Sequence, residues 1–423
     1  MKILLINYRY YEAAGPERYL FNVKQLLESH DHEVIIFSSN YKKNTPSKYQ
    51  LYFADPPGGD DESFYYKDLK LNSKSIASLL GRQFYSRHVY DRLVKLIQDT
   101  KPDIAYVLHF VRKLSPSIID ACYDLRVPVI VRLSDFVLIC PKHSFYRNGA
   151  VCELCQKNVW NSVKYNCVKD SKAASLVNYF AFQFNYLRGF QHKIAEIISP
   201  SLFAISRFKK NKHYHNTRFN HIPTFVNPAL FEIGKKRRKS KSSNTIIYWG
   251  RISHEKGIDS LLFAMERLKA EYCSVKLLII GSGEREYIDH LRSFIASHGL
   301  TDVEYIPFLE KEKLYEIIQT GDVAVVPSVC YDNMPNSAIE AQALGLPLIA
   351  SDVECLPEIV QDGFNGYLHT GGDSVSLANA IKKFFANDRL QIAMSENSYR
   401  WAVDHYSAEL HYQRLIETFQ HHL

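Results

Sequence analysis

Long apolar runs, dense cysteines and a secretion signal are all absent from this chain of 423 residues. No window approaches the roughly 18 uninterrupted apolar residues of a membrane-spanning helix. The apolar run after Met1 covers only about four residues, which is too short for the core of a signal peptide. Eight cysteines are too few for a disulfide framework in a chain of this length. These absences predict a cytoplasmic protein whose thiols stay reduced.

A strong charge imbalance and the motifs of nucleic-acid binding are also missing. The chain has 52 basic and 45 acidic residues, a net charge of +7, and much of the excess lies at residues 209–212 and 235–241. Such runs are typical of solvated linkers, but they also suit an anionic membrane surface or an anionic acceptor. Because no recognition motif accompanies the charge, nucleic acid is not an expected partner. No Gly-x-Gly-x-x-Gly follows the first strand, which argues against a dinucleotide oxidoreductase.

The N-terminal half has the pattern of an α/β domain. An apolar strand at 2–7, an amphipathic helix at 18–29 and an apolar strand at 34–37 form a βαβ unit, which implies a parallel sheet. Further short apolar segments predict strands at 104–108, 127–131 and 196–199. The aromatic stretch at 176–190 departs from this pattern. It fits either core packing or an interfacial face for a lipid-linked acceptor.

A second α/β series follows a basic, serine-rich stretch at 234–244, where we place the domain boundary. The series predicts strands at 245–249, 275–280, 323–326 and 347–350, with helices at about 257–271 and 336–344. The fold expected is therefore α/β, with two Rossmann-like domains in tandem and a cleft between them. The predicted parts are an N-terminal domain at 1–235 with a cysteine-bearing insertion at about 140–190, a C-terminal domain at 245–395, and a helix at 396–423 that packs back on the N-terminal domain.

The second half carries residues suited to a diphosphate. Binding a leaving diphosphate requires fixed cations and a helix N-terminus. Arg251 and Lys256 bracket a loop that follows a strand and opens a helix, and Gly250 lets the chain turn there. After the next strand, Gly283 lets backbone approach a ligand closely, although a plain turn explains it equally well.

A second group of candidates surrounds the start of the helix at 336–344. Asn336 and Ser337 lie where the first amides of a helix are free. Asp332 precedes this helix and Glu340 lies about one turn inside it. The two carboxylates can therefore reach opposite ends of one ligand.

These motifs occur together in one order. They run Gly-Arg…Glu-Lys-Gly, Gly-x-Gly, then Pro-Ser…Asp-Asn-x-Pro…Ile-Glu-Ala…Gly-x-Pro-Leu-Ile-Ala-Ser-Asp. In this the sequence resembles the retaining glycosyltransferases of the GT-B fold (glycosyltransferase family 4-like, "glycosyl transferases group 1"). The resemblance is strong over about residues 245–370 and loose over the N-terminal half.

The resemblance implies a role for each matching residue. Arg251 and Lys256 would contact the donor diphosphate, and Glu340 would accept hydrogen bonds from the ribose hydroxyls. Asp332 stands where the family usually has a glutamate that reaches the transferred sugar, and its reach is about one methylene shorter. Backbone for the phosphate and sugar, and the turn that contacts the base, would come from Met334, Pro335, Asn336, Ser337 and Phe308.

The N-terminal half matches the family less closely. Gly15 lies in a small-residue loop after the first strand and could approach the donor phosphates, unless it only caps a helix. Members often carry a histidine and an acid after the strand at 127–131, where this chain has Ser134 and Asp135. His109 ends an earlier strand at a second position that is often histidine. It is the best candidate for a polar contact at the sugar, although a histidine at a strand end is often structural.

Four cysteines cluster in the insertion, at Cys140, Cys152, Cys155 and Cys167. Their central Cys-x2-Cys pair fits a structural zinc site with four thiolates. Unliganded thiols or disulfides would explain the cysteines as well. No catalytic cofactor is expected, because no Asp-x-Asp metal motif is present.

The resemblance implies a retaining, metal-independent glycosyltransferase whose donor is a nucleoside-diphosphate sugar. Its acceptor would be a saccharide or lipid-linked saccharide in surface polysaccharide or lipopolysaccharide assembly. That setting would place the protein in the cytoplasm or peripherally at the inner face of the membrane. The alternatives are a catalytically inactive sugar-nucleotide-binding subunit and a nucleotide-sugar epimerase of the same fold.

Overall fold

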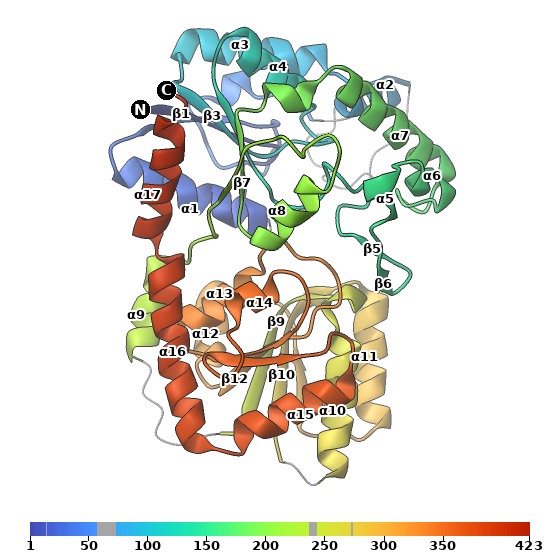
Figure 1. Ribbon diagram of the computed structural model, residues 1–423, viewed down its shortest axis with the longest axis vertical. Coiled ribbons are helices and arrows are strands. Elements are labelled where there is room, and N and C mark those ends of the chain that lie inside the picture. Colours follow the sequence, from blue (N-terminus) through green and yellow to red (C-terminus); the bar gives the residue numbers. More distant parts are fainter. Residues whose placement is uncertain (14, 57–72, 237–242, 272–273) are drawn as a thin grey trace. The chain divides into compact units, whose positions relative to one another are not determined.

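The computed structural model describes residues 1–13, 15–56, 73–236, 243–271 and 274–423, which form two compact units (Figure 1). The first unit comprises Met1–Ser144, Glu153–Ile222 and Tyr412–Leu423. The second comprises Phe145–Cys152 and Pro223–His411. Within the described residues, no helix combines the length and the apolarity that crossing a membrane requires.

A six-stranded sheet with parallel pairing forms the centre of the first unit. Its strand order is β2-β1-β3-β4-β7-β8. In β1 the residues Ile3 to Ile6 are all fully buried, as expected for a parallel strand that is covered on both faces. The strands are β1 (Lys2–Asn7), β2 (Glu33–Phe37), β3 (Ile104–His109), β4 (Val129–Arg132), β7 (Glu196–Ser199) and β8 (Phe219–His221).

Helices connect the strands of the first unit. They are α1 (Gly15–Ser29), α2 (Ser73–Gln83), α3 (Arg87–Thr100), α4 (Ser117–Asp124), α5 (Leu154–Lys157), α6 (Asn161–Lys164), α7 (Lys172–Leu187) and α8 (Leu202–Lys209). The end of the last helix, α17 (Ala408–Gln420), also belongs to this unit, where the ring of Phe419 lies 5.4 Å from that of Tyr106. Close by, Nε2 of His422 lies 2.8 Å from Oε2 of Glu196.

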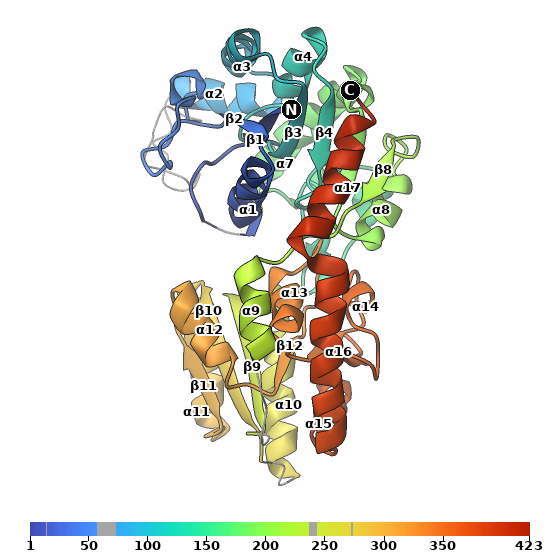
Figure 2. The same ribbon diagram turned by 90° about the vertical axis from the view of Figure 1, so that its left-hand side faces the viewer.

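The second unit is built on another six-stranded sheet with parallel pairing, in the order β11-β10-β9-β12-β13-β14. Strands β9, β10, β11 and β12 of this sheet are labelled in Figure 2. Successive residues of β9 enter different cores: Ile246 and Tyr248 pack on one face, and Ile247 and Trp249 pack on the other. The strands are β9 (Thr245–Ile252), β10 (Lys276–Gly283), β11 (Val303–Ile306), β12 (Val323–Val326), β13 (Leu348–Ser351) and β14 (Gly366–His369).

Each face of this second sheet is covered by its own helices. The core on one face includes residues of α10 (Ile258–Ala270), α11 (Arg285–Ser297) and α15 (Ser374–Phe385). The core on the other includes residues of α9 (Pro228–Lys236), α12 (Lys311–Ile318), α13 (Asn336–Ala343), α14 (Leu356–Ile359) and α16 (Asp388–Tyr406). Two α/β units with parallel sheets confirm the predicted fold class.

The predicted insertion at 140–190 is divided between the units. Residues Phe145–Cys152, which include the short hairpin of β5 (Tyr146–Arg147) and β6 (Ala150–Val151), belong to the second unit. There the ring of Phe145 meets the ring of Tyr331 at 5.7 Å. The rest of the insertion, including the aromatic helix α7, belongs to the first unit.

Candidate functional site

The site predicted for a diphosphate lies at the carboxyl ends of β9 and β12 in the second unit. Lys256 ends a short 3-10 helix after β9, and its ammonium forms an ion pair with the carboxylate of Asp332, which follows β12. Burial lowers the pKa of Lys256, but the charge of Asp332, the nearby Cys330 and the hydrogen bond to Asp332 together outweigh it, and the net shift is upward. The side chain therefore stays a cation at neutral pH.

Backbone contacts hold the loop that carries Lys256. Gly257 has a φ of 71°, and a Cβ atom there would lie 1.9 Å from the carbonyl oxygen of Pro327. The amide of Val329 donates to the carbonyl of Glu255 at 3.0 Å. The loop after β9 is thus joined to the loop after β12, and only glycine fits where they cross.

Arg251 is the second-last residue of β9, just before this loop, and is more open to solvent. Its Nη2 atom is 2.8 Å from Oε1 of Glu255, and 62% of its side chain is exposed. The hydroxyl of Tyr248 donates to the carbonyl of Arg251 at 2.7 Å, which holds the backbone at this point. The structure therefore places Arg251 at the end of β9 and at the surface, and Lys256 in the loop that follows, where it is largely buried.

The two predicted glycines have separate structural roles here. Gly250 has a φ of 149°, which side chains rarely adopt. Gly283 is paired with Ile252 in the ladder between β9 and β10, and a Cβ atom on it would lie 1.9 Å from the carbonyl oxygen of Ile252. Strand packing alone thus requires glycine at 283, and a donor contact there stays a prediction.

The second predicted group lies at the start of α13. Met334 and Pro335 precede the helix, and Asn336 and Ser337 are its first residues. The sulfur of Met334 lies 3.3 Å from the amide of Thr224. Glu340, one turn further on, is 7% exposed. A buried carboxylate behind a helix N-terminus is an arrangement that suits a hydroxyl-bearing, anionic ligand.

Phe308 lies apart from these residues, after β11. Its side chain is 65% exposed, which is unusual for a large aromatic ring. Such a ring has a free face on which a planar base could stack.

Glu354 is a member of this site that the sequence interpretation missed. It follows β13, and its Oε2 atom accepts a hydrogen bond from the amide of Asp332. Burial and the charge of Asp332 raise the pKa of Glu354 to about 11. One signal could have found it, because the segment after β13 must reach the same sheet edge as those after β9 and β12.

In the first unit, the predicted residue His109 lies at the end of β3, beside Asp135. Nε2 of His109 lies 3.7 Å from Oδ2 of Asp135, and the ring of Tyr8 meets the His109 ring edge-on at 4.9 Å. Burial lowers the pKa of His109 although Asp135 opposes the shift, so the imidazole is largely neutral at pH 7. Ser134 stands before Asp135, where members of the family often have a histidine. In the structure Asp135 nevertheless has a histidine beside it, because His109 comes from the end of β3.

Gly15, the remaining predicted residue of the first unit, begins α1. Two residues further on, the carboxylate of Glu17 is buried and lies 3.7 Å from the guanidinium of Arg9. The structure thus places Gly15 at a helix start, which is the position that either of its two predicted roles requires.

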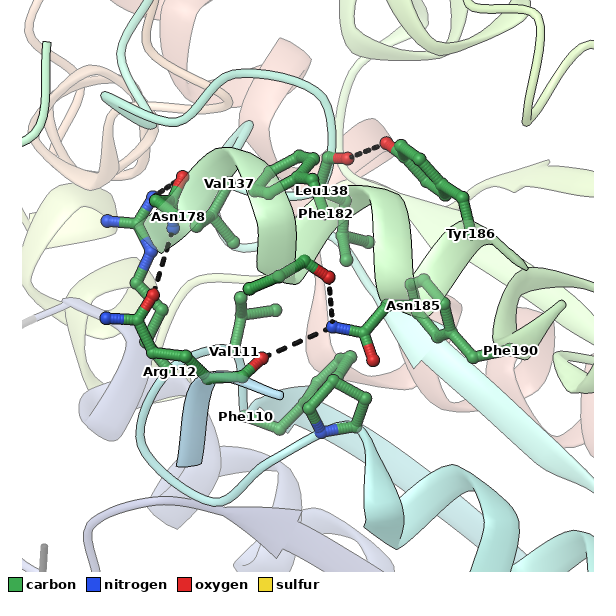
Figure 3. Close-up of a pocket in the computed structure, with 13 residues that line it drawn as sticks. Phe110, Val111, Arg112, Val137, Leu138, Asn178, Phe182, Asn185, Tyr186 and Phe190 are labelled. Carbon is green, nitrogen blue, oxygen red and sulfur yellow. Dashed lines mark hydrogen bonds between the residues drawn. The ribbon is translucent and has the colours of Figure 1, made fainter. Parts of the chain in front are cut away.

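The first unit also contains a largely apolar pocket beneath α7, with an open volume of about 400 Å³ (Figure 3). Two of its polar side chains bind backbone: Asn185 donates to the carbonyl of Ala181 at 2.8 Å, and the Tyr186 hydroxyl donates to that of Leu138 at 2.8 Å. The walls that remain suit an apolar group. They are formed mainly by Phe110, Val111, Val137, Leu138, Phe182 and Phe190.

The outer face of α7 is also apolar. Phe180, Phe184 and Leu187 follow one another at helical spacing, and they are 53%, 38% and 87% exposed. Large apolar side chains gathered at a surface mark an interaction site. The aromatic stretch thus combines the two predicted roles: α7 buries Phe182 and Tyr186 in the core and also has an exposed apolar face.

The four predicted zinc ligands find no support as a group. Among the described residues, which include all four cysteines, no three His, Cys, Asp or Glu side chains could hold a metal ion together. Cys152 belongs to the second unit, whereas Cys140, Cys155 and Cys167 belong to the first. The zinc site therefore stays a prediction, and no role below depends on it.

Comparison with known families gives one match, and it covers the second unit. Residues 231–401 match the family model described as "Glycosyl transferases group 1". The phosphatidyl-myo-inositol mannosyltransferase of Mycobacterium leprae is 30% identical over 193 residues, which cover 43% of this chain and 50% of that protein. The amylovoran biosynthesis glycosyltransferase AmsK of Erwinia amylovora is 28% identical over 36% of this chain and 38% of its own length. The chain thus spans about half, or less, of these relatives.

Solved structures match over nearly the whole chain. Sucrose-phosphate synthase of Thermosynechococcus elongatus superposes with a TM-score of 0.70 and 16% identity, over 99% of this chain and 98% of its own. HepE of Anabaena, solved with UDP-glucose, gives a TM-score of 0.63 and 18% identity over 99% of both chains. At these identities the likeness establishes the fold, which is the predicted GT-B fold with two α/β units.

Proposed function

Because residues 231–401 match the family model described as "Glycosyl transferases group 1", we propose that the protein is a glycosyltransferase that uses a nucleoside-diphosphate sugar as donor. The observation that carries the proposal is the ion pair between Lys256 and Asp332 beside the start of α13. A largely buried cation, paired with a residue shortly before a helix N-terminus, supports the binding of a leaving diphosphate. A structural neighbour, HepE of Anabaena, was solved with UDP and with UDP-glucose.

In this proposal the second unit holds the donor. Lys256 binds the diphosphate from a fixed position, and Arg251, which is exposed, closes on it from the surface. The amides at the start of α13 bind the phosphate and sugar oxygens. Glu340 accepts hydrogen bonds from the ribose, and the exposed ring of Phe308 stacks on the base.

Charge develops on the diphosphate as the bond to the sugar breaks. The protonated ammonium of Lys256 and the helix amides stabilise this charge without a metal ion. We infer retention of anomeric configuration, with the acceptor hydroxyl attacking from the face that the diphosphate leaves. Its proton then passes to a phosphate oxygen, and the neutral His109, held beside Asp135, makes a polar contact at the sugar.

For the acceptor we propose a lipid-linked saccharide in surface polysaccharide assembly. The apolar pocket beneath α7 and the exposed Phe180, Phe184 and Leu187 support an apolar part of the acceptor. The basic residues 209–212 would favour an anionic membrane surface; of the other basic run, residues 237–241 lie outside the described residues. Two relatives carry names that fit, a phosphatidyl-myo-inositol mannosyltransferase and an amylovoran biosynthesis glycosyltransferase.

A panel of nucleotide sugars tests the proposal. UDP-glucose and other sugars linked to UDP, GDP or ADP would be compared, first for thermal stabilisation of the protein and then for release of nucleoside diphosphate. A transferase releases the diphosphate faster when acceptor is added. An inactive binding subunit is stabilised but releases none, whereas an epimerase yields free nucleotide and an epimerised sugar without acceptor. Failure of every donor to bind would overturn the proposal.

A further inference from the structure

The two oxygens of the Glu354 carboxyl group differ in their hydrogen bonding. Oε2 accepts a hydrogen bond from the backbone amide of Asp332. Oε1 is buried and makes no hydrogen bond to any residue that the structure describes. Nearly all buried polar atoms make a hydrogen bond, so a buried oxygen without one, in the proposed binding site, needs an explanation.

The backbone at Glu354 is held in a conformation that disfavours this residue. Its φ is 63°, in the left-handed region where glycine, asparagine and aspartate are the usual residues. Glycine would adopt the same backbone without strain but would remove the carboxyl group. Strain of this kind collects at functional sites, where the side chain rather than the backbone is what the site requires.

The neighbours of Glu354 are those of the donor site. The charged and titratable groups that act on it are the carboxylate of Asp332 and the ammonium of Lys256, and Glu354 in turn acts on Cys330 and Cys355. Because burial and Asp332 raise the pKa of Glu354 to about 11, the carboxyl carries a proton at neutral pH. Since Oε2 accepts from the amide, the proton belongs on Oε1, where it can be donated to a ligand.

Asp332 gives the reason why such a group is wanted. Its carboxylate is already paired with Lys256. Its reach toward a sugar is therefore limited by this partner. A second carboxyl from the next loop of the same sheet edge, fixed to the amide of Asp332, supplies the missing reach.

We propose that Glu354 determines donor specificity by hydrogen bonding, through Oε1, to a hydroxyl group of the transferred sugar. The inference rests on the proposed function, because it requires a nucleotide sugar in this site. In this proposal Glu354 contacts the sugar of the donor and does not contact its nucleotide. The ligand class is a hexose or related ring with a free hydroxyl toward the loop after β13.

Two substitutions separate this role from a structural one. Glu354→Gln keeps an acceptor for the Asp332 amide and a donor for the ligand, so it preserves both contacts. Glu354→Gly removes the carboxyl and relieves the left-handed strain. The matched control is Asp31→Gly, which relieves the same conformation (φ 60°) at an exposed residue of the first unit.

The measurement is calorimetric titration of each variant with UDP-glucose and with UDP. If another nucleotide sugar of the panel binds wild type more tightly, that sugar and its diphosphate are used. We expect Glu354→Gly to bind the nucleotide sugar about 10-fold more weakly and the diphosphate within about twofold of wild type. Glu354→Gln should stay within about threefold for both ligands, and Asp31→Gly should match wild type.

Other results would overturn the inference in recognisable ways. If Glu354→Gly weakens diphosphate and nucleotide sugar equally, Glu354 only holds the Asp332 loop. If it changes neither affinity, the carboxyl does not touch the ligand. If wild type itself binds no nucleotide sugar of the panel, the proposed function fails first, which is a separate outcome.

Discussion

The ammonium of Lys256 and the carboxylate of Asp332 form an ion pair across 76 residues of sequence. The two side chains are only 16% and 24% exposed, so neither is a simple surface charge. The pair stands at an edge where three loops of one sheet converge, after β9, β12 and β13. The predictions that follow test what this edge binds and what holds it in place.

Removing the ammonium should abolish tight donor binding. We expect Lys256→Ala to bind the nucleoside diphosphate about 10- to 100-fold more weakly, because a buried cation is lost and Asp332 is left unpaired. The measurement is calorimetric titration with the diphosphate of the best donor. Lys276→Ala is the control, since Lys276 pairs with Glu304 at 3.3 Å on the exposed surface of the same sheet. If the two variants bound the diphosphate with equal affinity, Lys256 would not be part of the binding site.

The crossing of the two loops depends on Gly257. Gly257→Ala adds a Cβ atom against the carbonyl of Pro327 in a left-handed conformation, and should lower the free energy of unfolding by about 2 kcal/mol or more. Gly363→Ala is the matched control, because Gly363 has a similar φ of 78° with nothing within 4 Å of the added atom. It should lose only about 1 kcal/mol. Urea denaturation compares them, and equal losses would show that the close approach is unimportant.

Glu354 should make stability depend on pH. Its pKa is about 11 in the folded chain, against 4.5 for the ordinary group, so between these values the folded state holds a proton that the unfolded state has lost. Stability from this group is complete below about pH 4.5 and falls as pH rises, by at most about 1.4 kcal/mol per pH unit. The melting temperature of wild type should therefore fall relative to Glu354→Gln between pH 6 and pH 9. A constant difference across that range would mean that the carboxyl is ionised.

His109 and Asp135 should act as one unit. Both His109→Gln and Asp135→Asn are expected to lower the turnover number about 10-fold or more, and the double variant should be little worse than either. Asp135→Asn keeps Oδ1, which accepts a hydrogen bond from the amide of Val137 at 2.8 Å, so the local turn survives. Steady-state release of diphosphate measures the effect. Additive losses would show that the two side chains act independently.

The outer face of α7 should bind lipid. Replacing Phe180, Phe184 and Leu187 with serine is expected to abolish sedimentation with vesicles of phosphatidylglycerol and phosphatidylcholine, because the exposed apolar area is lost. The control replaces Val375, Leu390 and Ile392, which are similarly exposed in the second unit (44%, 44% and 51%). Retained binding in the α7 variant, or loss in the control, would contradict a membrane role for this helix.

The central strands of both sheets could be predicted because parallel strands read as continuous apolar runs. The edge strand β8 (Phe219–His221) was missed, since its three residues are only half-buried and Asn220 and His221 are polar. The sequence could indicate that the segment of Glu354 reaches this sheet edge, but neither the contact of Glu354 with Asp332 nor that of Asp135 with His109 could be predicted from it. Each pair joins segments that are distant in sequence, and only the order of strands in the sheet brings them together.

The central claim is tested most directly by measuring the release of nucleoside diphosphate. The substrate is the nucleotide sugar that gives wild type the largest thermal stabilisation. With a saccharide acceptor present, wild type should release diphosphate and form a glycoside, and Lys256→Ala and Glu340→Ala should be slower by about 10-fold or more. The account would be contradicted if no nucleotide sugar binds, or if both variants bind and turn over donor as wild type does.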